Sequence, residues 1–260
     1  MGELDGQVAI VTGGGRGIGR AVAVALVQAG AAVSVAARSA DELADTSKAI
    51  ATAGGRVVAV PTDVRDATAV RHLVAETEQQ LGPVTLLVNN AGTPGPAGND
   101  WEVDAEQWWE CQEVIVRGAF LCHQAVVPGM LARGGGRIIN MVSVTGTRAY
   151  PPIMATSVAK TALLRMTEGL AQTAGPHGVH VFAVHPGVVK TRLLLSYKFG
   201  LPESVYAPAE RAADLCVRLA SGRYDALSGR FLTIDDDLDA LGQRAAELAQ
   251  QEQLLLRIKT

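Results

Sequence analysis

Short, continuous apolar runs alternate along this chain with longer stretches of helical composition, and that alternation limits the possible folds more than any other feature. The runs are apolar on consecutive residues rather than on alternate ones, which is typical of strands covered on both faces in a parallel sheet. Repeated strand–helix units predict one doubly wound α/β domain, with a mostly parallel sheet of about seven strands and helices on both faces. We predict strands at residues 8–11, 33–37, 57–60, 86–88, 138–142, 181–184 and 231–234, and helices at 17–29, 41–53, 66–80, 104–132 and 155–173.

Composition supports a folded domain and argues against two classes of partner. A length of 260 residues suits a single α/β domain, and 48% hydrophobic residues can form a sizeable core. The net charge of −3 gives no electrostatic reason to expect binding to nucleic acid or to an anionic membrane. We therefore expect neither nucleic acid nor a membrane as a partner.

The N-terminus and the cysteines indicate a reducing compartment. Residues 1–5 are acidic overall and lack the basic and apolar regions of a signal peptide. No apolar run is expected to reach the length that spans a membrane. The three cysteines, Cys111, Cys122 and Cys216, are scattered and have no metal-like spacing. We predict a cytoplasmic protein without a metal site.

A glycine-rich segment directly after the first predicted strand is the strongest local motif. It opens the first predicted helix and reads Thr12-Gly13-Gly14-Gly15-Arg16-Gly17-Ile18-Gly19. Gly13 permits a tight turn, while Gly17 and Gly19 allow the backbone to approach a pyrophosphate and the helix to pack closely on the sheet. The helix N–H groups would then face the phosphates. We predict a dinucleotide site of the Rossmann type; the alternative is a purely structural turn.

Three further motifs accompany the glycine turn. Ser143 follows the fifth predicted strand, Lys160 lies in the next helix, and the fourth strand ends in Asn89-Asn90-Ala91-Gly92. Together with the glycine turn, these residues resemble the short-chain dehydrogenase/reductase family over about residues 6–235. In that family a tyrosine four residues before the lysine transfers a proton. This chain has Thr156 at that position.

The resemblance implies a nearly complete set of contacts to a nicotinamide dinucleotide. In this family Asn89 would brace the sheet, and the segment after the sixth strand would hold the nicotinamide amide. The residues at cofactor-contacting positions are Gly13, Gly15, Arg16, Gly17, Ile18, Gly19, Arg38, Ser39, Asp63, Val64, Asn90, Ala91, Gly92, Lys160, Pro186, Gly187, Val189 and Thr191.

Charge at the end of the second strand favours NADP(H) over NAD(H). NAD-binding members of the family carry an acidic residue there, which accepts hydrogen bonds from the ribose hydroxyls. This chain has Arg38 and Ser39 instead, so no carboxylate repels a 2′-phosphate and the arginine offers a planar charged fork. Arg16 can add a second positive charge. The alternative is that both arginines point to solvent.

The family's proton relay is altered at two of its four polar positions. Ser143 and Lys160 are present, but Thr156 replaces the tyrosine and Ile115 replaces the asparagine. A threonine hydroxyl is shorter and far less acidic than a phenol, whose pKa is near 10. We expect ordinary carbonyl reduction to be slow. Tyr150 is a candidate stand-in from a nearby loop, or it lines the substrate pocket; Thr156 can also be an engineered replacement.

Three functions follow from the sequence. The first is an NADP(H)-dependent oxidoreductase acting on a small carbonyl or alcohol, with Ser143, Lys160 and Thr156 or Tyr150 in its active site. The second is a cofactor-assisted dehydratase, cyclase or isomerase on the same fold. The third is a non-catalytic protein that responds to NADP(H). The resemblance also implies a homodimer or homotetramer, formed through helices 104–132 and 155–173.

Two segments lie outside these motifs. Residues 193–208 follow a strand's carboxyl end and include Tyr197 and Phe199; we interpret them as a mobile substrate lid or an ordinary surface loop. We divide the chain into an NAD(P)-binding domain at 1–235 and a C-terminal helical extension of the same domain at 236–260. The acidic run at 235–237 suits the start of a helix. That extension packs on its own domain or makes a subunit contact.

Overall fold

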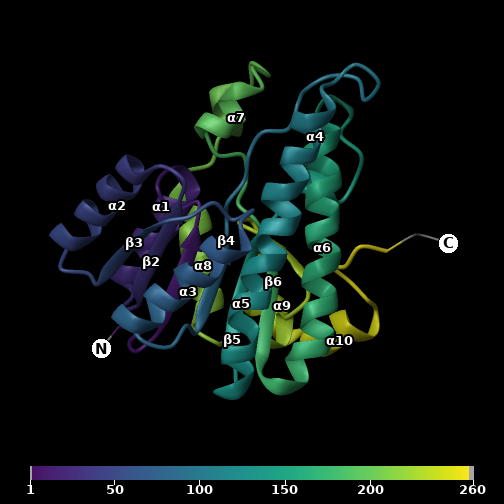
Figure 1. The fold of residues 1–260 in the computed structure, drawn as a ribbon. Helices are drawn as coiled ribbons and strands as arrows, with labels where there is room; N and C mark the ends of the chain where they lie inside the picture. Colours follow the sequence, from purple (N-terminus) through teal and green to yellow (C-terminus); the bar gives the residue numbers. More distant parts are fainter. Residues whose placement is uncertain (1, 258–260) are drawn as a thin grey trace.

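The computed structural model describes residues 2–257 and contains a seven-stranded sheet (Figure 1). The strand order is β3-β2-β1-β4-β5-β6-β7, and each neighbouring pair runs parallel. The predicted doubly wound Rossmann-type fold is confirmed. The strands are β1 (Val8–Thr12), β2 (Ala32–Ala37), β3 (Val57–Pro61), β4 (Leu86–Asn89), β5 (Gly136–Met141), β6 (Val179–His185) and β7 (Phe231–Thr233).

Helices cover both faces of the sheet, which explains why its strands are apolar on consecutive residues (Figure 1). At the centre, Val11 of β1 pairs in register with Val35 of β2 and Val88 of β4, and all three side chains are fully buried. One face carries α1 (Gly17–Gln28), α2 (Ala40–Thr52) and α8 (Ala209–Ala220), and the other carries α3 (Ala67–Gln80), α5 (Gly118–Ala132) and α6 (Met154–Ala174).

Helix α8 is an element that our sequence analysis did not predict. It follows Pro208 and packs on α1, and its residues Ala212, Cys216 and Leu219 are fully buried. Small side chains let two helices approach closely, and the buried residues of α8 recur at helical spacing, so the pattern was present in the sequence and our prediction overlooked it. The missed segment therefore forms part of the core.

The helix predicted at 104–132 is built from three pieces. It contains α4 (Ala105–Gln112), a π-helical turn η1 (Glu113–Arg117) and then α5. We expected no apolar run of membrane-spanning length, and this was wrong, because Ala105–Ala132 is long and apolar enough by length and composition. Of its most apolar window, 44% is buried inside the protein. Helices in the core of a globular domain share these properties.

The C-terminal segment folds back onto the sheet and its helices. The Asp237 carboxylate accepts hydrogen bonds from the first N–H groups of α9 (Leu238–Gln243), so the acidic run does begin a helix. The backbone leaves the helical region at Arg244, and α10 (Ala245–Gln250) follows as a separate helix. Leu238 and Leu248 are buried in the same core cluster as α1 and α8.

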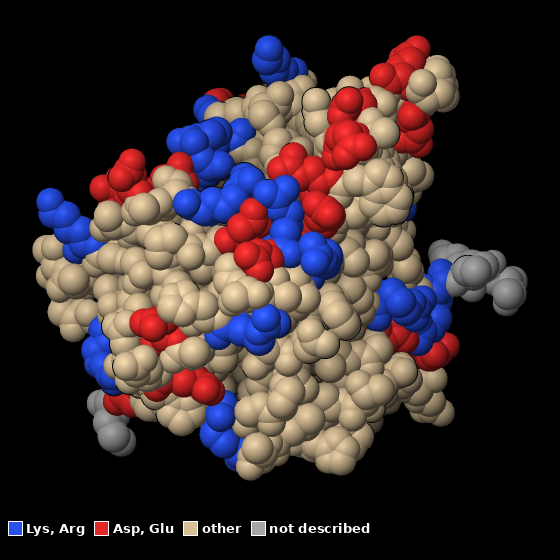
Figure 2. Space-filling view, in the orientation of Figure 1, with Lys and Arg blue, Asp and Glu red and all other residues tan. Residues whose placement is uncertain are grey.

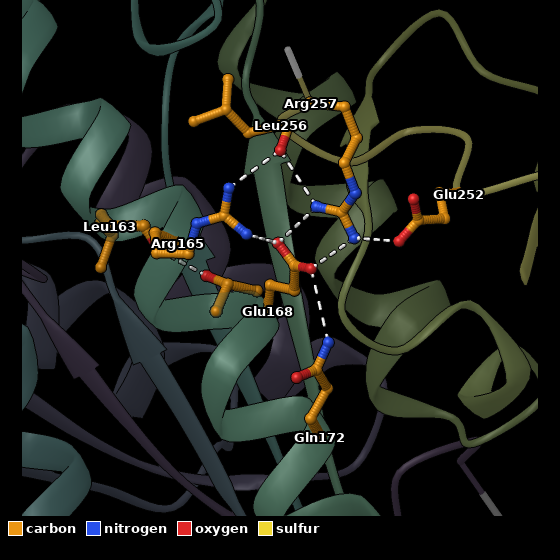
Figure 3. Close-up of polar contacts among 8 residues, drawn as sticks. Leu163, Arg165, Glu168, Gln172, Glu252, Leu256 and Arg257 are labelled. Atoms are coloured by element: carbon orange, nitrogen blue, oxygen red, sulfur yellow. Dashed lines mark hydrogen bonds and ion pairs between the residues drawn. The ribbon is translucent and has the colours of Figure 1, made fainter.

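An ionic cluster fastens the end of this segment to α6 (Figure 3). Glu168 on α6 is 6% exposed, and its carboxylate accepts from the two Nη atoms of Arg257 at 2.7 and 3.1 Å. Arg165 donates to the same carboxylate and to the Leu256 carbonyl oxygen. Met1 and residues 258–260, which our predicted boundaries included, lie outside the described residues.

Candidate active site

The strand order reverses between β1 and β4, and this places the site. β1 leads to α1 on one face of the sheet, whereas β4 leads through α4 to α5 on the other. Open α/β sheets bind ligands at the carboxyl ends of the strands beside such a switch point. The loops after β1, β2, β3, β4, β5 and β6 at that edge hold nearly all of the predicted site residues.

The turn after β1 is shaped for close backbone approach. Gly13 has φ +64°, and a Cβ there would lie 2.8 Å from Asn90 Nδ2. A Cβ on Gly19 would lie 2.2 Å from the Gly13 carbonyl oxygen, so α1 packs against the turn only because the side chain is absent. Arg16 does not cap α1 with its side chain, and the first turn from Gly17 carries no acidic residue. The first N–H groups of α1 are therefore available to an anionic ligand.

Thr12 and Asn90 join that turn to the end of β4. Asn90 Nδ2 donates to the carbonyl oxygens of Thr12 and Gly13, at 3.0 and 3.2 Å. Thr12 Oγ1 in turn accepts from the N–H groups of Asn90 and Ala91, each at 3.1 Å. The side chain of Asn90 thus holds the glycine turn in shape, and the exposed Gly92 follows it at the mouth of the site.

A buried polar network behind β4 ties the sheet to two helices. Asn89 Nδ2 donates to Asn140 Oδ1 of β5 at 2.9 Å. Asn140 Nδ2 donates to Thr167 Oγ1 of α6 at 2.9 Å, and His123 Nε2 of α5 lies 3.1 Å from Asn140 Oδ1. Burial lowers the pKa of His123 to about 4, so its ring is neutral near pH 7. This network fixes where α6, and with it Lys160, stands relative to the sheet.

Charged side chains surround the end of β2. Arg38 Nη1 lies 3.8 Å from Glu110 Oε1 of α4, and the arginine side chain is 61% exposed. Arg16 Nη1 pairs with Glu42 Oε1 at 2.8 Å, and Ser39 caps α2 by accepting from the Glu42 N–H. Figure 2 shows positive and negative side chains intermixed on the surface between α2 and α4. Both arginines predicted to select the nucleotide therefore lie at this edge, each with a carboxylate partner.

The pair after β3 is held by neighbouring side chains. Arg65 donates to Asp63 from Nε and Nη2, at 3.0 and 2.7 Å, and these hydrogen bonds lower the pKa of the Asp63 carboxyl. The carboxylate is therefore ionised and can accept a further hydrogen bond. Val64 is buried, and a Cβ on Gly118 would lie 2.7 Å from its Cγ2. The start of α5 thus fits directly against this loop.

The segment after β6 returns to the glycine turn. Gly187 has φ +77°, a left-handed conformation that suits glycine. Thr191 caps α7 (Arg192–Ser196), because its Oγ1 accepts from the Leu194 N–H at 3.2 Å. A Cβ on Gly17 would lie 3.3 Å from Thr191 Cγ2, so the two segments are close neighbours. The remaining predicted contacts are the buried Pro186 and Val189, the partly buried Ile18, and the buried Gly15, which faces Glu42.

The Lys160 side chain reaches the end of β5, just before Ser143 in the sequence. Lys160 Nζ donates to the Met141 carbonyl oxygen at 2.6 Å, two residues before Ser143. A Cβ on Gly146 would lie 2.8 Å from the Lys160 carbonyl carbon, so the glycine lets α6 approach this turn. Ser143 Oγ accepts from the Thr145 N–H at 3.2 Å, which leaves its own hydrogen for a substrate oxygen. Burial lowers the pKa of Lys160 to about 8.

Position 156 holds a hydroxyl that contacts a phenol. Thr156 Oγ1 lies 2.7 Å from the Oη of Tyr197, the residue that ends α7. The Gly95 N–H donates to the same Oη at 3.1 Å, and Cys111 Sγ lies 3.8 Å from Thr156 Oγ1. Tyr150 lies before η3 (Pro151–Ile153) and is 40% exposed. The phenol that meets Thr156 therefore comes from the segment interpreted as a lid.

Ile115 occupies the π-helical turn η1 and is 2% exposed. It belongs to the apolar cluster that includes Ala159 and Leu163 of α6. A π-helical turn inside an α-helix frequently accompanies a functional site. The distortion of the backbone is present here, and the side chain at position 115 is a buried isoleucine.

These features fit a dinucleotide. The glycine turn leaves room for its pyrophosphate, and the uncapped α1 supplies amide donors. Sequence reasoning missed the contributions of Glu110, Gly146 and Tyr197. An aromatic residue soon after β6 was a usable signal for Tyr197, but no local pattern relates Glu110 to Arg38, which are far apart in the sequence.

Comparisons with known proteins agree with this architecture. A family model described as short chain dehydrogenase matches residues 7–198. A protein named short chain dehydrogenase from Pseudocercospora fijiensis is 34% identical, over 94% of this chain and 85% of its own. 2-(S)-hydroxypropyl-CoM dehydrogenase 3 from Xanthobacter autotrophicus is 34% identical, over 92% of this chain and 89% of its own. A crystal structure of a short-chain type dehydrogenase/reductase from Mycobacterium marinum has a TM-score of 0.81 and 30% identity, covering 88% of this chain and 94% of that one. The chain belongs to the short-chain dehydrogenase family.

Proposed function

We propose that this protein is an NADP(H)-dependent oxidoreductase that interconverts a small carbonyl compound and its alcohol. The observation that supports this is that Lys160 Nζ donates to the Met141 carbonyl oxygen, two residues before Ser143, at the same edge of the sheet as the uncapped start of α1. A nucleotide lying along that edge would bring its reactive end towards these two side chains. The family model that matches residues 7–198 is described as short chain dehydrogenase.

Each polar residue has a defined task in this proposal. When bound, the reduced nicotinamide nucleotide supplies the hydride. Ser143 Oγ donates a hydrogen bond to the carbonyl oxygen, because its hydrogen is not used when Oγ accepts from the Thr145 N–H. Lys160 has a pKa of about 8 and stays largely protonated at pH 7, so it keeps a positive charge near the oxygen that gains negative charge.

Stopped-flow absorbance tests the reaction class. The unmodified protein is mixed with NADPH and a panel of ketones, aldehydes and quinones, and loss of the reduced nucleotide is recorded. We expect turnover with at least one carbonyl compound. Tight NADPH binding without turnover across the panel would count against the proposal. Turnover that leaves the nucleotide unchanged would favour the dehydratase, cyclase or isomerase that the sequence also allows.

The preference for NADP(H) is supported by Arg38 and Arg16 beside Ser39. Fluorescence titration compares the binding of NADPH and NADH to the unmodified protein and to Arg38→Ala. We expect the variant to lose about 10-fold in NADPH affinity, the magnitude of one charge-assisted hydrogen bond, and little in NADH affinity. Arg71→Ala is the control, because that guanidinium donates to Thr68 on exposed α3. A clear NADH preference would overturn the assignment.

We further propose a homodimer or homotetramer in the cytoplasm. α4 and α6 lie side by side at one end of the molecule (Figure 1). Trp109, Phe120 and Val158 of α4, α5 and α6 are 61%, 53% and 39% exposed, which offers apolar surface to a second copy. The free, buried cysteines Cys111, Cys122 and Cys216 suit a reducing compartment. Light scattering at micromolar concentration tests the assembly, and a monomer would exclude it.

A further inference from the structure

One phenol reaches the active site from a segment outside the family's motifs. Tyr197 lies 41 residues after Thr156 in the sequence, yet its Oη is 2.7 Å from Thr156 Oγ1. The Gly95 N–H, in the loop after β4, donates to the same Oη at 3.1 Å. The phenol oxygen is thus held by hydrogen bonds with Gly95 and Thr156. Thr156 lies in the first turn of α6, four residues before Lys160.

The location of this oxygen matters for what a side chain at position 156 could do. A threonine hydroxyl lies one bond beyond Cβ. An oxygen atom that is hydrogen-bonded to this hydroxyl lies farther from α6. A longer side chain at position 156 could also place an oxygen atom at that distance. Tyr197 Oη therefore supplies a phenol oxygen near position 156, although its ring enters from α7 instead of α6.

The ring of Tyr197 is also held in place. Phe199 stacks on it, with ring centroids 5.2 Å apart and 13° between the planes. Between them, Lys198 has φ +54°, a left-handed conformation that costs a non-glycine residue about 1 kcal/mol. That turn brings Phe199 back onto Tyr197. A strained residue beside a half-buried phenol indicates that the position of the ring is specified by the fold.

The phenol remains protonated at neutral pH. Burial raises the pKa of Tyr197, and the hydrogen bond with Thr156 offsets part of that rise. The Cys111 thiol, the nearest titratable group on α4, also has a raised pKa because it is buried. Since the Gly95 N–H already donates to Oη, the O–H hydrogen of Tyr197 is left to donate to Thr156 or to a substrate oxygen.

We propose that Tyr197 is the catalytic proton donor of this enzyme and that Thr156 is the residue that positions it. The proposal rests on the proposed carbonyl–alcohol interconversion. In reduction, the carbonyl π bond breaks, hydride from the reduced nicotinamide nucleotide forms the new C–H bond, and the proton of Tyr197 Oη forms the O–H bond. The phenolate then takes a proton from solvent through the Thr156 hydroxyl. In alcohol oxidation each transfer runs in reverse.

This arrangement puts the proton donor on a peripheral segment. α7 projects beyond the edge of the sheet (Figure 1), and Leu193 on it would contact a Cβ placed on Gly92 at 3.7 Å. Movement of α7 away from α6 would withdraw Tyr197 Oη from Thr156. The donor is therefore in place only when residues 193–199 are closed over the site, which couples proton transfer to substrate enclosure.

Matched variants separate the phenol's chemistry from its packing. Tyr197→Phe removes only the oxygen and keeps the ring that stacks on Phe199. Thr156→Val removes the positioning hydroxyl, and Thr156→Ser restores it. Tyr206→Phe is the control on the same segment, and Tyr150→Phe tests the rival phenol. Each full-length variant is measured for NADPH affinity by fluorescence, for phenol ionisation by ultraviolet titration, and for single-turnover carbonyl reduction.

We expect Tyr197→Phe to slow reduction about 100-fold or more, within the range for a positioned proton donor, and to change NADPH affinity less than about twofold. Its ultraviolet titration should lack one ionisation above pH 10, because the buried phenol is gone. Thr156→Val should slow reduction about 10-fold and raise that ionisation, since a hydrogen bond that lowers it is lost. Thr156→Ser should return both quantities towards those of the unmodified protein.

The outcomes distinguish the two proposals. If the unmodified protein reduces a carbonyl compound and Tyr197→Phe stays within about threefold of it, the role of Tyr197 is overturned while the oxidoreductase stands. A large loss in Tyr150→Phe instead would assign the proton to the other phenol. If the unmodified protein binds NADPH but reduces nothing in the panel, the proposed function fails, and the catalytic role of Tyr197 fails with it.

Discussion

Two regions of the active site share one edge of the sheet but are made from different parts of the chain. The nucleotide cradle (Gly13–Gly19 with Asn90) is formed by backbone, and its shape depends on absent side chains. The proposed proton-transfer wall (Ser143, Thr156, Lys160 and Tyr197) is formed by side chains from separate parts of the chain. Such a site tolerates little change at Gly13 or Gly19, because a Cβ there would lie 2.8 Å from Asn90 Nδ2 or 2.2 Å from the Gly13 carbonyl oxygen. A side-chain site can be rebuilt from any element whose side chain reaches the same point.

The largest effect should follow from adding one methyl group to the cradle. Gly19→Ala places a Cβ 2.2 Å from the Gly13 carbonyl oxygen, so the turn must shift. We expect a loss of about 3 kcal/mol in the free energy of unfolding and at least about 100-fold in NADPH affinity. Urea unfolding and fluorescence titration measure the two quantities.

Gly169→Ala is the matched control, because a Cβ in that part of α6 meets nothing within 4 Å. It should stabilise the protein by about 0.5–1 kcal/mol, as expected for alanine in a helix, without affecting the nucleotide. Unchanged NADPH binding in Gly19→Ala would show that the cradle is less rigid than its geometry indicates.

Lys160 belongs to the wall, and its burial should make stability depend on pH. Below about pH 8 the lysine is charged in both the folded and the unfolded protein, so the folded state bears the full penalty of a buried charge. Between pH 8 and its ordinary value of 10.5, the folded protein has lost that proton while the unfolded chain keeps it. The unfolded state then binds more protons, and this contribution to stability rises with pH.

We therefore compare Lys160→Met with the unmodified protein by urea unfolding at several pH values. The stability of the unmodified protein relative to the variant should rise by on the order of 2 kcal/mol from about pH 7 to pH 10.5. Using the difference removes the contributions of Cys122 and Cys216, which both proteins contain and whose pKa values are raised by burial alone. A constant difference across this range would mean that Lys160 titrates as an exposed lysine.

Moving the phenol from position 197 to position 156 tests whether α6 can supply the proton donor in place of the segment after α7. In Thr156→Tyr alone, two phenols compete for one place beside Gly95, so we expect a lower melting temperature and no faster reduction. The double variant Thr156→Tyr with Tyr197→Ala makes space for the new ring. It should reduce carbonyls at least about 10-fold faster than Tyr197→Ala alone. Faster turnover in the single variant would argue that Tyr197 does not occupy the site.

The smallest effect concerns the charges at the mouth of the cradle. Glu110 Oε1 lies 3.8 Å from Arg38 and 3.3 Å from Arg65, so Glu110→Gln releases both arginines from a carboxylate. We expect NADPH affinity to rise about threefold and NADH affinity to stay constant, with the gain shrinking at higher salt. Glu106→Gln, on the first turn of the same helix, is the control. An equal gain for both nucleotides would remove Arg38 as a phosphate contact.

Sequence patterns anticipated the sheet much better than the wall. All seven strands and the glycine turn follow local rules. Burial on both faces favours apolar residues at consecutive strand positions, and a missing Cβ requires a glycine, so both can be seen in the residue types themselves. Helix α8 follows a local rule too, because its buried residues recur at helical spacing, and our prediction overlooked it. Tyr197 escaped as a candidate proton donor because its contact with Thr156 spans 41 residues and two separate elements.

The sequence by itself determined a parallel doubly wound sheet, a glycine-rich turn after β1, and a threonine and an isoleucine at positions 156 and 115. Only the tertiary structure decided which side chains meet at position 156, and it brought Tyr197, Gly95 and Cys111 there from three separate elements. Local conformation is set by neighbouring residues, and so it can be inferred from a short pattern. A side-chain contact depends on how the closed fold brings distant segments together, and no short stretch of sequence carries that information.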